Sequence, residues 1–154
     1  MALASSPAPF YTEDMISVLI VDEHEPVRQA LEACLAATGD VQVVKSTGRY
    51  VQAVESARAL LPDVILLETK TPDGLATLAA LRAAAPHSAI IVLTSYPDSR
   101  EEEAVLAAGA VAYVLKTLDT QALIQAIRSA PEAGLPDADP LGKGMPPKEG
   151  AVRG

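Results

Sequence analysis

Five short apolar runs recur along the chain with helix-like segments between them, and this rhythm restricts the fold more than any other feature. The runs cover residues 16–21, 41–44, 64–67, 90–93 and 111–115. Runs that are apolar at consecutive positions suit parallel strands buried on both faces, whereas an antiparallel surface strand would alternate apolar and polar residues. The sequence therefore predicts an α/β fold, in which helices cover both faces of a parallel sheet.

Prolines, glycines and capping residues mark the ends of the expected helices. Pro26 suits the first turn of a helix that Gly39 closes. Asp98 followed by Glu101 three residues later resembles a capping box at the start of another helix. The acidic first turn of that helix is expected to be a solvated surface, stabilised by the helix dipole.

The length of 154 residues fits one domain with free ends. We expect the domain to span residues 15–130. Residues 1–14 are expected to form a flexible N-terminal extension, and residues 131–154, rich in proline and glycine, a flexible tail.

Charge and hydropathy exclude several function classes. The net charge of −8 and the lack of a Lys/Arg cluster disfavour direct nucleic-acid binding. No apolar run approaches the ~20 residues that a membrane span needs, so we expect a cytoplasmic chain without a membrane partner. The single cysteine, Cys34, lies at helical spacing among apolar residues and is expected to be a buried thiol.

Chemically active side chains stand where four of the predicted strands end. They are Asp22 and Glu23, Glu68, Thr94 and Ser95, and Lys116. Ligands of open parallel sheets gather beyond the carboxyl ends of the strands. Clustered carboxylates need a divalent cation such as Mg²⁺ or an ammonium beside them, and a hydroxyl and a lysine next to a carboxylate suit an acyl phosphate.

Four segments resemble the receiver domains of two-component response regulators, in particular those usually joined to LuxR-type helix-turn-helix domains. Residues 18–28 are similar to the acidic-pair segment, 62–67 to the approach to the phosphoacceptor, 92–95 to the switch hydroxyl, and 108–116 to the switch aromatic and lysine. The resemblance runs from residue 16 to about 128. It implies a flavodoxin-like (CheY-like) fold, with a five-stranded parallel sheet of order 2-1-3-4-5 and five helices on its two faces.

The same resemblance implies an acidic Mg²⁺ site. Asp22 and Glu23 would be the acidic pair, Glu68 the acceptor-equivalent ligand, and the backbone carbonyl of Lys70 a further ligand, with binding weak or absent. His24 follows the acidic pair, but without a second histidine nearby it is expected to cap or pack and not to bind metal.

The resemblance also implies a switch. Lys116 would pair with the acceptor carboxylate, Thr94 would contact the phosphoryl group, and Tyr113 would turn inward when Thr94 moves. In this sequence the acceptor position holds Glu68, where the family carries aspartate.

Glutamate adds one methylene, which moves the carboxylate outward from the position of an attacking oxygen. Misplacement by ~1 Å can cost ~100-fold in rate. The displaced charge would come nearer Thr94 and Lys116 and partly imitate a phosphoryl group. We therefore expect a phosphorylation-independent pseudo-receiver that works through a protein partner or a homodimer, on the face that the resemblance assigns to helix four, strand five and helix five.

Two alternatives remain open from the sequence. The chain can still be a receiver phosphorylated at Glu68 or Asp22, or the regulatory remnant of a DNA-binding response regulator. A phosphatase of related architecture needs a strand-end aspartate nucleophile, which residue 68 does not supply, so we do not expect an enzyme.

Overall fold

The computed structural model describes residues 15–69, 73–116 and 120–132. Its strands are β1 (Ile16–Val21), β2 (Val41–Thr47), β3 (Val64–Glu68), β4 (Ala89–Thr94) and β5 (Ala112–Leu115). Its helices are α1 (Glu25–Ala36), α2 (Tyr50–Leu60), α3 (Gly74–Ala84), α4 (Ser99–Ala107), α5 (Thr120–Ser129) and the short 3₁₀ helix η2 (Ala130–Glu132).

The strands form one parallel sheet in the order β2-β1-β3-β4-β5, as the sequence predicts. The central strand β3 is buried along its whole length, which explains why its sequence is apolar at consecutive positions. Val21 of β1 lies beside Leu67 of β3, and Glu68 lies beside Leu93 of β4. The carboxyl ends of these three strands therefore come to the same level of the sheet.

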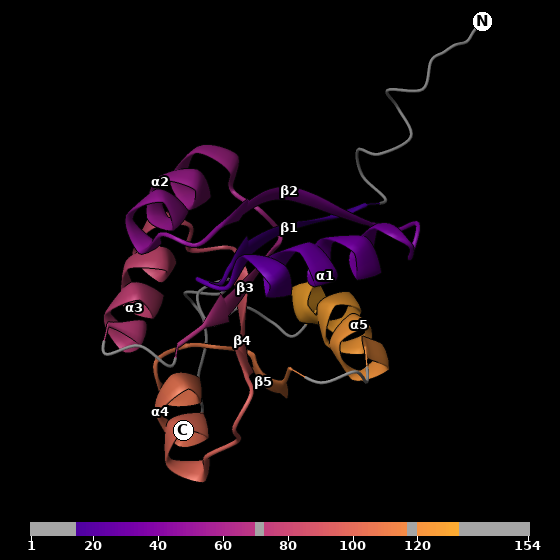
Figure 1. The fold of residues 1–154 in the computed structure, drawn as a ribbon. Helices are drawn as coiled ribbons and strands as arrows, with labels where there is room; N and C mark the ends of the chain where they lie inside the picture. Colours follow the sequence, from indigo (N-terminus) through magenta and orange to yellow (C-terminus); the bar gives the residue numbers. More distant parts are fainter. Residues whose placement is uncertain (1–14, 70–72, 117–119, 133–154) are drawn as a thin grey trace, which may run out of the picture.

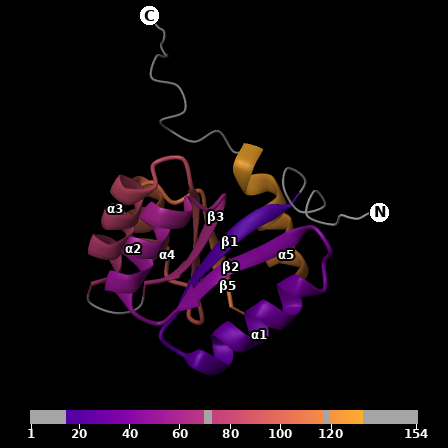
Figure 2. The same cartoon turned by 90° about the horizontal axis from the view of Figure 1, so that it is seen from above.

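Helices cover both faces of the sheet, with α1 and α5 on one side and α2, α3 and α4 on the other (Figures 1 and 2). Alternate residues of β3 enter the two cores. Ile65 and Leu67 pack on the side of α2, α3 and α4, and Val64 and Leu66 pack on the side of α1 and α5. Burying one such side chain contributes about 1.5–3 kcal/mol, so the two cores dominate the stability of the domain.

Two of the predicted helix signals are found where the sequence places them: Pro26 lies in the first turn of α1, and the Asp98 side chain caps α4. The end of α1 comes earlier than expected, because Ala37 is its C-cap and Gly39, with a φ of 85°, lies two residues further on. The ranges 1–14 and 133–154, where flexible ends are predicted, lie outside the described residues. Residues 131–132, which fall in the predicted tail, belong to η2.

No helix in the described ranges is both long and apolar enough to cross a membrane.

Candidate functional site

The predicted site residues at the ends of β1, β3 and β4 are buried at one edge of the sheet. Asp22 and Thr94 have no exposed surface, and Glu68 is 3% exposed. This arrangement follows from the parallel order, because β1 and β4 flank β3 and all three end at the same level. Polar groups in such a place need partners, since a buried charge without compensation is costly.

Asp22 has partners on both carboxylate oxygens. The Lys116 ammonium donates to Oδ2 at 2.7 Å, and the His24 backbone N–H donates to Oδ1 at 2.9 Å. The His24 ring nitrogen Nδ1 lies 3.0 Å from the same Oδ1. His24 is thus a partner of Asp22 at the N-cap position of α1, although its side chain forms no capping hydrogen bond and is 58% exposed.

The partner of Lys116 differs from the one expected. Lys116 was expected to pair with the carboxylate of residue 68, but in the structure its ion pair is with Asp22. Asp22 has no exposed surface, so the ammonium compensates a charge that cannot reach water. The strand-end position of Lys116 was predicted correctly, and its choice between two buried carboxylates was not.

Glu68 is held through its backbone by a residue that the sequence analysis missed. The hydroxyl of Tyr50, the first residue of α2, donates to the Glu68 carbonyl oxygen at 3.0 Å. An aromatic residue at a helix start gives no sequence signal for a partner that lies 18 positions away. Tyr50 thus ties α2 to the end of β3 at the acceptor-equivalent residue.

Thr94 closes the turn that follows β4. Its hydroxyl donates to the Tyr96 carbonyl oxygen and accepts from the Tyr96 backbone N–H, both at 3.1 Å. Among the described residues, neither Thr94 nor Lys116 forms a hydrogen bond or ion pair with Glu68. The expectation that the longer acidic side chain comes nearer both groups stays a prediction.

Tyr113 of β5 is bound by the first turn of α4. Its hydroxyl donates to Glu101 Oε1 at 2.6 Å. Burial, and then the hydrogen bond to the Glu101 carboxylate, raise the pKa of the Tyr113 phenol above its ordinary value. Glu101 also accepts from the Thr69 hydroxyl, through Oε2 at 2.8 Å. The expectation that the acidic first turn of α4 would be simply solvated is therefore wrong for Glu101.

Comparison with known proteins assigns this geometry to a family. The family model described as the response regulator receiver domain matches residues 18–128. The chain belongs to this family.

Similar proteins carry the receiver as part of a longer chain. The transcriptional regulatory protein LiaR of Bacillus subtilis is 37% identical over 118 residues, which cover 75% of this chain and 56% of LiaR. The response regulator protein VraR of Staphylococcus aureus is 31% identical over 115 residues, which cover 73% of this chain and 55% of VraR. The chain therefore spans a little over half the length of these relatives.

A solved structure supports the same fold. The signal receiver domain of the putative response regulator NarL from Mycobacterium tuberculosis matches with a TM-score of 0.71 at 25% sequence identity, covering 77% of this chain and 98% of that domain. The fold and the family predicted from the four sequence segments are both confirmed.

The expected Mg²⁺ ligands of the receiver do not form a metal site among the described residues. These residues contain no group of three His, Cys, Asp or Glu side chains that could hold an ion. Glu23 is exposed, and both Asp22 oxygens already have partners. Lys70, whose carbonyl was expected to be a ligand, lies outside the described residues. In this conformation the Asp22 oxygens would have to exchange a present partner for the ion.

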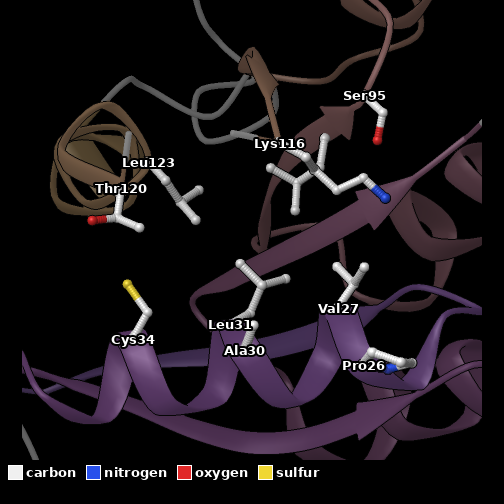
Figure 3. A pocket seen from close by; sticks show the side chains of 10 residues that line it. Pro26, Val27, Ala30, Leu31, Cys34, Ser95, Lys116, Thr120 and Leu123 are labelled. Atoms are coloured by element: carbon white, nitrogen blue, oxygen red, sulfur yellow. The ribbon is translucent and has the colours of Figure 1, made fainter. Parts of the chain in front are cut away.

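A mostly apolar groove with a cavity volume of about 450 Å³ lies between α1 and α5 of the receiver (Figure 3). Its lining residues are Pro26, Val27, Ala30, Leu31, Cys34, Leu93, Ser95, Lys116, Thr120 and Leu123. Ser95 and Lys116 lie toward one end and Cys34 and Thr120 toward the other (Figure 3). Cys34 is only partly buried, which corrects the expectation of a buried thiol, because α1 and α5 do not close over it.

Proposed function

We propose that this receiver works without phosphorylation, as a pseudo-receiver of a two-component pathway that acts through protein contacts and not as an enzyme. The observation that carries the proposal is the acceptor-equivalent position: Glu68 stands there, only 3% exposed, while Lys116 is bound to Asp22. Phosphoryl transfer depends on an accurately placed nucleophile and on positive charge around the transferred group. In this conformation residue 68 is largely shielded and the lysine is already paired.

The proposal includes weak or absent Mg²⁺ binding. An entering ion would compete with the Lys116 ammonium and the His24 N–H for the oxygens of Asp22. The contacts give no support to the stronger idea that Glu68 imitates a phosphoryl group, because Thr94 is occupied by Tyr96 and Lys116 by Asp22. We therefore propose one stable conformation that does not need a phosphoryl signal.

Acetyl phosphate with Mg²⁺, followed by intact-mass measurement, tests this function. We expect no gain of a phosphoryl group on the unchanged chain, and a gain in Glu68→Asp, whose shorter side chain restores the family's nucleophile. Glu102→Asp, the same change on an exposed turn of α4, is the matched control and is expected to stay unlabelled. A stable gain of one phosphoryl group on the unchanged chain would favour the alternative, a receiver still phosphorylated at Glu68 or Asp22.

We propose the face formed by α4, β5 and α5 as the contact surface for a protein partner or a second copy. Leu106 in α4 and Leu115 in β5 are 42% and 41% exposed, and Tyr96, just before α4, is 76% exposed. Sedimentation with and without Mg²⁺ tests assembly. If a dimer uses this face, Leu106→Glu and Leu115→Glu are expected to weaken it, and Leu60→Glu, on a 47% exposed leucine of α2, is not.

The second candidate function is the regulatory part of a transcription factor, in the cytoplasm. LiaR is named a transcriptional regulatory protein, and this chain spans about half of it. The net charge of −8 argues against direct contact with the DNA backbone by this part. A gel shift at low salt is expected to show no complex. A shift that disappears as salt rises would contradict this reading.

A further inference from the structure

The start of α4 has an unusual cap. Asp98 accepts from the backbone N–H groups of Arg100 at 2.8 Å and Glu101 at 3.3 Å, as an N-cap residue does. In a capping box, the Glu101 side chain would in turn accept from the Asp98 N–H. Here the Tyr113 hydroxyl lies between them, because it accepts from the Asp98 N–H at 3.1 Å and donates to Glu101 Oε1 at 2.6 Å.

The other oxygen of Glu101 reaches a different strand. Oε2 accepts from the hydroxyl of Thr69, which is 7% exposed and directly follows Glu68 at the end of β3. One carboxylate therefore joins residues that lie 32 and 12 positions away from it in the sequence. Hydrogen bonds to a charged acceptor are among the stronger ones in proteins, so this junction is well suited to hold three elements together.

We propose that Glu101 is a positioning residue that joins the end of β3, the first turn of α4 and Tyr113 of β5, with the Tyr113 hydroxyl completing the cap of α4. Two consequences follow from this geometry. When the Tyr113 side chain leaves its place, the Asp98 N–H loses its acceptor and the first turn of α4 opens more readily. The same movement changes the surroundings of Thr69, beside the acceptor-equivalent residue.

The inference goes beyond the proposed function and is independent of it. The network passes through the side chain of Thr69 and not through that of Glu68. The acetyl phosphate experiment can therefore contradict the proposed pseudo-receiver while this junction stands, and the reverse is also true.

Amide hydrogen exchange in Tyr113→Phe tests the cap, because this substitution removes only the hydroxyl. We expect exchange at the Asp98 amide to become roughly ten-fold faster, which corresponds to the loss of one hydrogen bond of ordinary strength. The Thr69 amide resonance should shift as well. Glu101→Gln, which keeps the shape and removes the charge, should give the same two changes more weakly.

Glu102→Gln is the matched control, since Glu102 is exposed on the same turn of α4. It should leave both signals unchanged. Unchanged exchange at Asp98 in Tyr113→Phe, or an equal effect in the Glu102 control, overturns the proposal.

A second pair of variants tests the other side of the junction, should Tyr113→Phe fold poorly. Thr69→Val removes the hydroxyl at nearly constant size, and Thr69→Ser keeps it. We expect the ring resonances of Tyr113 to move in Thr69→Val and to stay in place in Thr69→Ser. Equal shifts in the two variants, or none in either, overturn the coupling between β3 and β5.

Discussion

Two ion pairs, one at each end of the sheet, have similar contact distances but lie in very different surroundings. Lys116 and Asp22 meet at 2.7 Å beyond the carboxyl ends of the strands, with side-chain exposures of 10% and 0%. Arg128 of α5 and Asp40, just before β2, meet at 2.9 Å at the opposite end, with exposures of 45% and 39%. Both pairs join residues about ninety positions apart in the sequence.

Neither ion pair was predicted from the sequence, but the edge of the sheet where Asp22 and Lys116 meet was. Asp22 and Lys116 end strands of a parallel sheet, so topology alone brings them to one edge. Asp40 and Arg128 lie on a connection and on a helix, and no periodic pattern specifies that they meet. The two pairs also differ in burial. Removing Lys116 leaves the Asp22 charge buried and unsolvated, whereas Asp40 and Arg128 are each still hydrated when the other is removed.

The largest effect is expected from Lys116→Met. This change keeps the aliphatic stem and leaves the Asp22 carboxylate buried without its ammonium, which typically costs about 3–5 kcal/mol. The free energy of unfolding, from urea denaturation at neutral pH, measures the loss. If the loss of unfolding free energy were below about 1 kcal/mol, the buried pair would contribute no more than an exposed pair does, which would contradict the proposed effect of burial.

The double variant Asp22→Asn, Lys116→Met is the control for this prediction. It removes both charges together, so its loss of stability should be clearly smaller than the sum of the two single losses. Additive losses would mean that the two side chains stabilise the domain separately and not as a pair.

A smaller, pH-dependent effect is expected at Tyr113. The pKa of its phenol is raised in the folded state by burial and by Glu101. Its contribution to stability is therefore fully present below the unfolded pKa of about 10 and is lost as pH rises through the folded pKa. Denaturation midpoints of the unchanged chain and of Tyr113→Phe should differ at pH 8 and converge in more alkaline solution. A difference that grows with pH would contradict the sign.

The fold was predictable because the apolar runs that mark the strands alternate along the chain with the residues that mark the ends of the helices. The fully apolar run ending at Leu67 required a central parallel strand, and the structure buries every residue of β3. Strand ends then gave the places of Asp22, Glu68, Thr94 and Lys116 without any contact information. Position along a strand is a local property, and the sequence encodes it directly.

Partners at the site were harder to foresee, because hydrogen bonding between distant side chains depends on differences of an ångström or less. The Lys116 ammonium had two buried carboxylates to choose from, and the sequence does not contain the distances that decide between them. The hydroxyl of Tyr50 reaches Glu68, and that of Tyr113 reaches Glu101, from helices and strands whose relative placement only the folded structure sets. The capping-box pattern correctly identified Asp98 and Glu101 at the start of α4. It did not indicate that the Tyr113 hydroxyl lies between them.

The smallest effect is expected from Arg128→Gln, at the exposed end of the comparison. Arg128 holds the pKa of Asp40 below its ordinary value, mainly through their hydrogen bond. The contribution of the pair is thus present above the unfolded pKa of Asp40 and is lost as pH falls through the folded pKa. At neutral pH we expect a shift of the urea midpoint far smaller than that of Lys116→Met, and 1 M salt should remove most of it, because solvent and ions screen an exposed pair. The shift of Lys116→Met should persist in the same salt, since the Asp22 carboxylate is out of reach of solvent ions. If salt reduced both shifts alike, burial would not be the property that separates the two ends of the sheet.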